Sequence, residues 1–127
     1  MKIKICGLNP ARDVQLCIDL KIDYLGFVFY EKSPRNFDLN NIQTLKNYDK
    51  KNSLFVAVTV NPSNEFIQNT VLNNFDFIQL HGSETCERVQ ENFSSMLRDS
   101  LFGIMFCFAL GYGFFLFDSF KLRQIFS

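Results

Sequence analysis

The sequence contains no tryptophan and only one histidine, His81. Its four cysteines are widely spaced, without a Cys-x-x-Cys pair or a histidine cluster, and this pattern predicts neither a zinc site nor a disulfide scaffold. Basic and acidic residues number 13 each, so no excess of positive charge indicates a nucleic-acid-binding surface. The amino-terminal residues lack the apolar run of a signal peptide, and a reducing cytoplasm is therefore the expected location.

Short apolar segments alternate with segments of helical periodicity along about the first 90 residues. The apolar segments, which we predict to be strands, cover residues 3–5, 24–29, 54–60 and 75–80. Each is followed by a polar residue that can cap a helix, at Asn9, Asp38, Asn61 and Ser83. The sequence therefore predicts four successive strand–helix units.

Strand–helix units of this kind imply a parallel sheet, because a connection through a helix joins parallel strands. The predicted strands are apolar on both faces, as a sheet that is covered on both sides requires. We therefore predict an α/β fold, for which a doubly wound sheet and a barrel both fit the pattern. A flavodoxin-like binding domain has the first of these architectures, but no glycine-rich phosphate-binding loop follows the first strand.

An almost wholly apolar segment covers residues 101–117 and is interrupted by three glycines. It predicts either two buried strands joined at residues 111–113 or a membrane span, since roughly 17 apolar residues is the lower limit for crossing a bilayer. We favour the two strands, because the strands of this repeat are expected to be apolar.

Ligands of parallel strand–helix folds bind at the carboxyl ends of the strands. A thiol, a guanidinium, an imidazole and a carboxylate are predicted at that edge, from Cys6, Arg35, His81 and Asp118. Taken singly, each has a structural explanation: a small buried side chain, a loop charge, a structural histidine and a helix cap. Their shared position makes them candidates for one site.

Four motifs in these units resemble those of one enzyme family. They are Lys-Ile-Cys-Gly-Leu at 4–8, Asp-Tyr-Leu-Gly-Phe-Val-Phe-Tyr at 23–30 with Lys-Ser-Pro-Arg at 32–35, Val-Ala-Val-Thr-Val-Asn at 56–61, and Asp-Phe-Ile-Gln-Leu-His-Gly at 76–82. In this order and at this spacing they resemble the phosphoribosylanthranilate isomerases, (β/α)₈-barrel enzymes of tryptophan biosynthesis. The resemblance covers about residues 2–90.

The resemblance implies an Amadori rearrangement of N-(5-phosphoribosyl)anthranilate to 1-(2-carboxyphenylamino)-1-deoxyribulose 5-phosphate, without a metal or cofactor. It implies that Cys6 is the general base and that Asp118, after the predicted sixth strand, is the general acid. Arg35 would hold the anthranilate carboxylate, a task that suits a planar and permanently charged group. His81 would belong to the substrate site.

The part of the chain after residue 92 resembles the family poorly. We expect one incomplete (β/α) barrel domain over residues 1–127, with about six parallel strands, four well-matched units in 1–92 and a divergent apolar tail in 93–127. The family's glycine-rich phosphate-binding loops are not found before the chain stops at Ser127, so we expect negligible turnover by this chain alone. The alternatives are a half-barrel that associates with itself or a partner through its open edges, and a membrane-tethered fragment.

Overall fold

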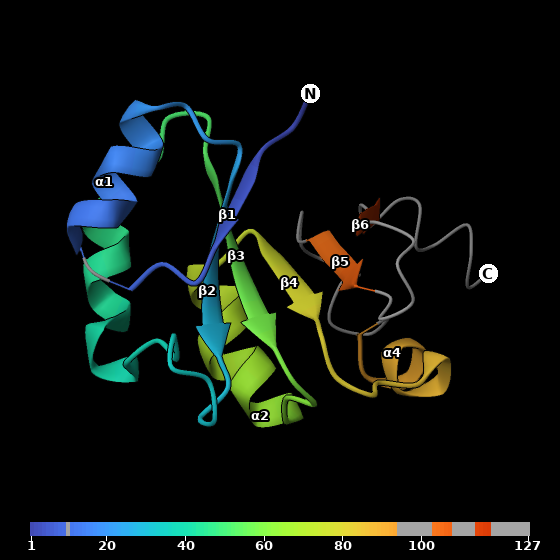
Figure 1. The fold of residues 1–127 in the computed structure, drawn as a ribbon. Helices are drawn as coiled ribbons and strands as arrows, with labels where there is room; N and C mark the ends of the chain where they lie inside the picture. Colours follow the sequence, from blue (N-terminus) through green and yellow to red (C-terminus); the bar gives the residue numbers. More distant parts are fainter. Residues whose placement is uncertain (10, 94–102, 108–113, 118–127) are drawn as a thin grey trace.

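A six-stranded sheet forms the centre of the molecule, with its strands in sequence order. The structure, a computed structural model, describes residues 1–9, 11–93, 103–107 and 114–117. Figure 1 shows the sheet twisting from β1 to β4, with β5 and β6 beside β4. The strands are β1 (Lys4–Cys6), β2 (Tyr24–Phe29), β3 (Leu54–Thr59), β4 (Phe77–Leu80), β5 (Gly103–Cys107) and β6 (Phe114–Phe117).

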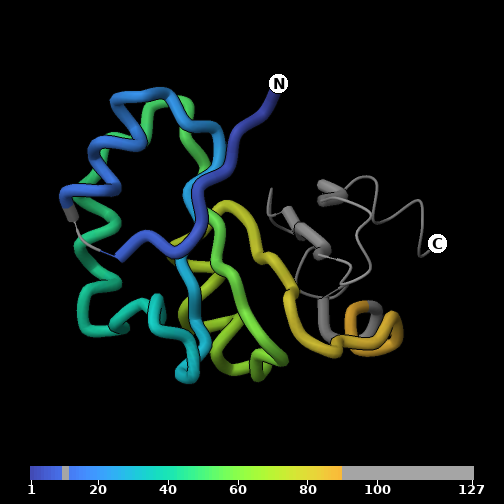
Figure 2. Tube along the Cα trace, viewed as in Figure 1, coloured from blue at the N-terminus to red at the C-terminus, as the bar shows by residue number. Residues whose placement is uncertain are grey.

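Helical segments connect the first five strands and lie outside the sheet, as the tube in Figure 2 also shows. Most are regular α-helix, but η1 is a 3₁₀-helix and η2 is a π-helical turn between α2 and α3. These three segments, α2, η2 and α3, follow one another without a break. The helical segments are α1 (Ala11–Asp19), η1 (Leu39–Asn47), α2 (Asn64–Phe66), η2 (Ile67–Val71), α3 (Leu72–Asn74) and α4 (Cys86–Phe93).

The first five strands pair in parallel, which confirms the predicted α/β class. The register runs through neighbouring positions, so that Cys6 is aligned with Gly26, Gly26 with Val56, and Val56 with Phe77. Parallel pairing places the carboxyl ends of these strands at one edge of the sheet. The predicted rim of functional groups therefore has a physical basis in this fold.

The sixth strand is antiparallel to the fifth, so the prediction of six parallel strands is wrong at this point. The physical reason is the length of the connection: residues 108–113 separate β5 from β6, whereas a parallel crossover needs roughly a dozen residues or more. Of the two alternatives for residues 101–117, the structure supports strands over 103–107 and 114–117. No helix in the described ranges is long and apolar enough to cross a membrane.

The main hydrophobic core lies between the sheet and the helical layer. Phe27 of β2 is fully buried there, and its ring packs against those of Phe37, Phe55 and Phe75, with centroids 5.2–5.8 Å apart. A smaller cluster of Tyr24, Val56 and Val58 lies on the opposite face of the sheet. The face that carries this second cluster also carries the candidate site.

Two predicted helix caps are wrong. Ser63, and not Asn61, caps the helix that begins with α2, because its Oγ accepts a hydrogen bond from the Phe66 amide at 3.1 Å. At α4, Thr85 takes the place predicted for Ser83, since the Arg88 amide donates to the Thr85 Oγ1 at 3.1 Å. The Asp38 cap is confirmed, although the helix that follows it is 3₁₀.

An aspartate at the beginning of β2 and another at the beginning of β4 bind the chain at the start of the preceding strand. We call each of these arrangements an aspartate clamp. Asp23 accepts a hydrogen bond from the Ile3 amide at 2.8 Å and pairs with the Lys2 ammonium at 3.1 Å. Asp76 accepts from the Phe55 amide at 2.8 Å and pairs with Lys50 at 2.7 Å. Each aspartate comes directly before its strand and so fixes the strand's start. The clamp thus occurs in both pairs of units, β1–β2 and β3–β4.

We expect the Asp23 clamp to make stability depend on pH in the acid range. The Ile3 amide, and after it Lys2, holds the pKa of Asp23 below its ordinary value, so the folded state favours the carboxylate. This contribution is present above the unfolded pKa of about 3.9 and is lost as the pH falls through the lowered folded pKa. In urea unfolding, the free-energy difference between wild type and Asp23→Asn should be constant from neutral pH to about pH 5 and shrink below about pH 4.

Lys2→Met serves as the control, because it removes the ammonium partner and leaves in place the Ile3 amide, which is the largest single cause of the lowered pKa. It should retain the part of the pH-dependent contribution that the Ile3 amide supplies. A difference between wild type and Asp23→Asn that stayed the same down to pH 2 would contradict this account.

Candidate functional site

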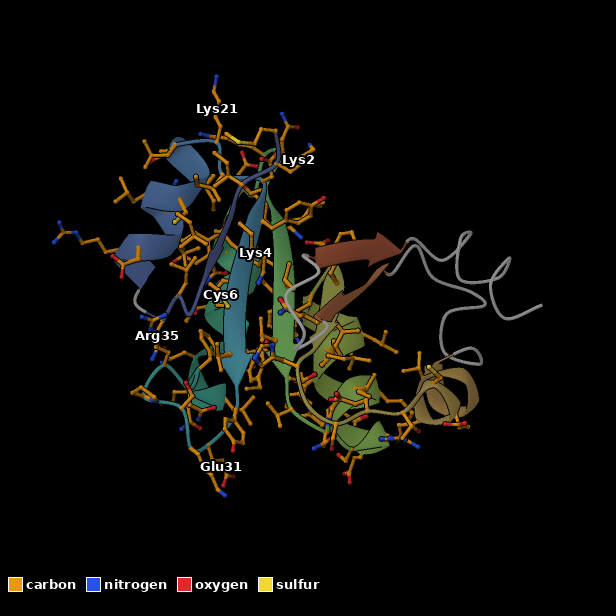
Figure 3. The ribbon with its side chains drawn as sticks, turned by 45° about the vertical axis from the view of Figure 1, so that its right-hand side comes forward. Lys2, Lys4, Cys6, Lys21, Glu31 and Arg35 are labelled. Carbon is orange, nitrogen blue, oxygen red and sulfur yellow. The ribbon has the colours of Figure 1, made fainter. Side chains whose placement is uncertain are left out.

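A cavity of about 620 Å³ opens on the face of the sheet opposite the helices, towards the carboxyl ends of the strands. It brings together three of the four predicted site residues, Cys6, Arg35 and His81. Figure 3 shows Lys4 and Cys6 along β1, with Arg35 on the loop nearby. The described residues that line the cavity are Lys4, Cys6, Gly7, Val28, Tyr30, Ser33, Arg35, Val58, Val60, Gln79 and His81.

Asp118 lies outside the described residues. Strand β6, which precedes it, runs against β5, and Phe117 is aligned with Ile104 near the beginning of β5. The described part of β6 therefore ends towards the amino-terminal edge of the parallel strands, and not at the predicted rim. The role of Asp118 as general acid stays a prediction.

Cys6 is exposed at the last position of β1, where the chain turns away from the sheet. The amides of Gly7 and Leu8 both donate to the Gly26 carbonyl, at 3.0 and 3.1 Å, and this ends the strand. Gly26 also leaves room for the thiol, because a Cβ at that position would stand 3.0 Å from the Cys6 Sγ. A glycine on the neighbouring strand thus makes the space into which the thiol projects.

The other described cysteines differ from Cys6 in their surroundings. Cys17 is buried in α1, and burial, with a smaller effect of the Asp13 carboxylate, raises the pKa of its thiol. Cys86 is exposed, but it begins α4 and does not line the cavity. Of Cys6, Cys17 and Cys86, Cys6 is thus the one that lines the cavity.

Arg35 belongs to a loop that is closed by its own hydrogen bonds. The Asn36 Oδ1 accepts from the Tyr30 amide at 2.8 Å, and the Ser33 Oγ accepts from the Arg35 amide at 3.1 Å. The stem of Arg35 lies directly over Gly7, where a Cβ would stand 2.5 Å from the Arg35 Cδ. Gly7 itself has a φ of +83°, a conformation that suits glycine. Because Gly7 has no side chain, the Arg35 side chain can pack against the backbone directly after β1.

His81 follows β4, and its loop is tied to the loop after β3. The two carboxylate oxygens of Glu84 accept from the amides of Asn61 and Gly82, at 2.7 and 2.9 Å. The Asn61 Oδ1 accepts from the Ser83 amide at 3.2 Å. The loops that border the cavity on the β3 and β4 side thus form one hydrogen-bonded unit.

The sequence analysis missed Lys4 and Gln79, which form the floor of the cavity. The Lys4 ammonium donates to the Gln79 Oε1 at 2.6 Å. Strand periodicity could have found both, since they lie two positions before Cys6 and His81 and so on the same face. The described lining includes two cations, Lys4 and Arg35, and no carboxylate, a balance that suits an anionic ligand.

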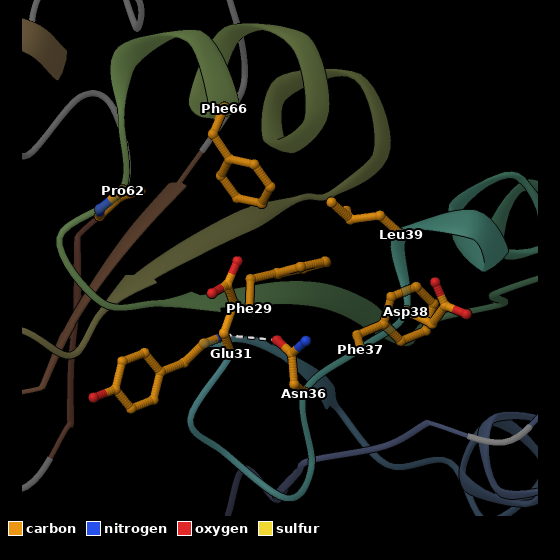
Figure 4. Close-up of a pocket in the computed structure, with 9 residues that line it drawn as sticks. Phe29, Glu31, Asn36, Phe37, Asp38, Leu39, Pro62 and Phe66 are labelled. Carbon is orange, nitrogen blue, oxygen red and sulfur yellow. Dashed lines mark hydrogen bonds between the residues drawn. The ribbon is translucent and has the colours of Figure 1, made fainter.

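A second cavity of about 510 Å³ lies between the loop after β2 and the beginning of α2. Figure 4 shows the Phe29 and Phe66 rings and Leu39 around it, with Glu31 and Asp38 also among its lining. Cys6, Arg35 and His81, the three described site candidates, do not line this cavity. No group of three or more metal-ligating side chains that could hold an ion is found within the described ranges.

The family model described as "N-(5'phosphoribosyl)anthranilate (PRA) isomerase" matches residues 3–100, which is most of the chain. The chain belongs to the phosphoribosylanthranilate isomerase family. The N-(5'-phosphoribosyl)anthranilate isomerase of Legionella pneumophila strain Corby is 37% identical over 89 residues, 68% of this chain and 42% of that protein. The enzyme of the same name from Sulfurihydrogenibium is 41% identical over 90 residues, 71% of this chain and 43% of that protein.

Solved structures of phosphoribosylanthranilate isomerases agree with this membership. The Thermus thermophilus enzyme has a TM-score of 0.72 at 23% identity, which shows the fold, and the match covers 87% of this chain and 53% of that one. A second structure, of a complex with reduced 1-(o-carboxyphenylamino)-1-deoxyribulose 5-phosphate, has a TM-score of 0.66 at 28% identity over 72% of this chain and 47% of that one. The chain thus matches part of a (β/α)₈ barrel and spans less than half the length of the curated relatives.

We expect Gly7→Ala to disturb the packing of the Arg35 side chain against residue 7. The added methyl group would meet the Arg35 Cδ, and alanine is strained at a positive φ, so unfolding free energy should fall by more than about 1 kcal/mol. Urea unfolding of Gly7→Ala, Arg35→Ala and the double variant separates the two causes. If the steric contact contributes, the double variant loses less than the sum of the single variants. Strictly additive losses would show that the backbone strain acts alone.

Proposed function

We propose that the cavity is the site of a phosphoribosylanthranilate isomerase. The observation that carries this proposal is that Cys6, Arg35 and His81, which the resemblance assigns to that site, line one cavity of a chain from this family. Two cations in the described lining also suit a substrate with a carboxylate and a phosphate. The match covers 42% of the Legionella pneumophila relative, so the activity of the full-length enzyme is proposed for this chain and does not follow from the match alone.

The proposed chemistry is an Amadori rearrangement that moves protons and needs no metal or cofactor. An acid, for which Asp118 is the candidate, protonates the ribose ring oxygen as its bond to C1 breaks and the C1–N iminium forms. Cys6, as the general base, then takes the proton from C2, and the C2–H electron pair forms the C1–C2 double bond of an enaminol. Tautomerisation of this enaminol gives the C2 ketone of the product. As a free thiol, Cys6 suits a reducing cytoplasm.

Arg35 orients the substrate in this proposal by binding the anthranilate carboxylate. Its loop is closed by hydrogen bonds and its stem lies on Gly7, so little freedom would be lost on binding. A guanidinium can hold both carboxylate oxygens, which fixes the aromatic ring relative to Cys6. His81, directly after β4, lines the same cavity, which supports its assignment to the substrate site in this proposal.

Binding of anthranilate itself tests the Arg35 assignment without requiring turnover. His81 is the single histidine, so its imidazole signals in an NMR spectrum report on the cavity alone. Anthranilate should shift these signals saturably, with a Kd of roughly 1 mM, about −4 kcal/mol. Arg35→Met should weaken this binding about tenfold or more, since a charge-assisted contact is removed. Arg12→Met is the control, because Arg12 is exposed on α1 and does not line the cavity.

The isomerase activity itself is tested by the loss of substrate fluorescence in a steady-state assay. We expect little turnover by the 127-residue chain alone. Any turnover should be abolished by Cys6→Ala and unchanged by Cys86→Ser, which alters an exposed cysteine outside the cavity. Turnover that survives Cys6→Ala, or anthranilate binding that is equal in Arg35→Met and Arg12→Met, would contradict the proposed site.

A second candidate function is assembly through the open edge of the sheet. β1 is the end strand of the sheet, and β2 is its strand neighbour among the described residues. Ile3 and Ile5 are 43% and 37% exposed there. An unpaired strand with exposed apolar side chains is a template for another strand. We therefore propose that the chain associates with a second copy along β1.

Light scattering coupled to size-exclusion chromatography tests this association. A discrete dimer is expected for the wild-type chain, and Ile5→Lys should convert it to a monomer by placing a charge at the edge. Leu39→Lys is the control, because Leu39 is 50% exposed but belongs to η1. A wild-type monomer, or a dimer that Ile5→Lys leaves intact, would show that β1 is not the interface.

A further inference from the structure

The hydrogen bond between Lys4 and Gln79 joins two strands that are not neighbours. Lys4 belongs to β1 and Gln79 to β4, and β2 and β3 lie between them. The Gln79 side chain is buried, at 3% exposure, and both residues line the candidate site. The bond therefore crosses the inner face of the parallel sheet beneath the cavity.

A flat sheet would not allow this bond. Neighbouring strands lie about 4.8 Å apart, which puts β1 and β4 about 14 Å apart along a flat sheet. Side chains stand roughly perpendicular to a sheet, so on a flat surface the two would point in the same direction without meeting. Their contact at 2.6 Å shows that the sheet curves around the cavity and that this curvature is fixed by a polar contact.

Each partner of this bond lies two residues before a candidate site residue, on the same face of its strand. Side chains alternate between the faces of a strand, so Cys6 lies one layer above Lys4, and His81 follows one layer above Gln79. In the sheet's pairing, Gln79 is one such step nearer the carboxyl ends than Phe77, which is aligned with Cys6 through Gly26 and Val56. Such a diagonal contact is what strand tilt in a barrel produces.

Gly26 makes the crossing possible. A Cβ at this position would stand 3.3 Å from the Lys4 Cε and 3.0 Å from the Cys6 Sγ. The Lys4 stem and the Cys6 thiol therefore pass the same glycine of β2, side by side. A change in the side-chain conformation of Lys4 would consequently shift the Cys6 thiol, because both side chains fill the space above Gly26.

We propose that Lys4 and Gln79 are positioning residues of the site, and that the hydrogen bond between them sets the separation of Cys6 from His81 across the cavity. Their catalytic meaning rests on the proposed function, but the separation is a property of the folded chain and can be measured without turnover. A displacement of about 1 Å in a catalytic group can reduce a rate about 10²-fold, so this contact matters for the proposed chemistry.

Paramagnetic broadening of the His81 signals by a nitroxide on Cys6 measures the separation. Cys86→Ser and Cys107→Ser direct the label to exposed Cys6, and His81 is the single histidine. Gln79→Leu removes the acceptor, and we expect His81 to lose broadening as the strands move apart. Gln79→Glu keeps an acceptor for Lys4 and should restore the wild-type broadening. Gln68→Leu, an exposed glutamine in η2, is the matched control and should change nothing.

Lys4→Met provides a second test, because it removes the donor and keeps an unbranched stem over Gly26. It should reproduce the loss of broadening seen in Gln79→Leu. Wild-type broadening in folded Gln79→Leu or Lys4→Met would overturn the proposal, and so would a failure of Gln79→Glu to restore it. Unfolding of both variants would assign the pair to stability and also overturn the positioning role. None of these outcomes depends on isomerase activity, so the proposed function stands or falls by its own tests.

Discussion

Parallel pairing of the first four strands is the constraint on which the candidate site depends. It requires the chain to return to the same edge before each new strand, and the segments from α1 to α3 make that return outside the sheet. Each of these four strands then ends at one rim, so Cys6, Arg35 and His81 line one cavity although the sequence separates them widely. The small cluster of Tyr24, Val56 and Val58 below the rim is a consequence of the same arrangement. A site built in this way can change its loops without changing its core.

The fold of residues 3–80 was largely predictable because it follows from periodicity. The predicted strand at 24–29 coincides with β2, and apolar runs located β1, β3 and β4 within two residues at either end. The caps were less predictable, because adjacent polar residues compete for one position and tertiary contacts decide between them. Asn61 is engaged by the loop after β4, since its Oδ1 accepts from the Ser83 amide, and Ser63 then caps the helix. Lys4 and Gln79 were missed because each looks like an ordinary strand residue until the curvature brings them together.

Strands β5 and β6 show the limit of a prediction that rests on the repetition of strand–helix units. Four strand–helix units led to the expectation that the fifth and sixth strands would repeat the pattern. The short connection over residues 108–113 leaves no room for a crossover helix, and β6 pairs antiparallel to β5. The length of this connection is visible in the sequence and is typical of an antiparallel pair. The same reversal removes the geometric reason for placing the end of β6 at the rim with Cys6.

The curvature of strands β1–β4 determines the shape of the cavity and so relates the fold to the candidate site. In a closed barrel the last strand pairs with the first, and this closure imposes the bend of every strand in between. In the described part of this chain, β1 is an end strand, so the bend of β1–β4 has to be maintained from within. The helical layer supplies a packed outer face, and the Lys4–Gln79 bond supplies a contact across the inner face. A flatter sheet would separate Cys6 from His81 while leaving each strand intact, so the geometry of the cavity depends on how firmly this inner contact is held.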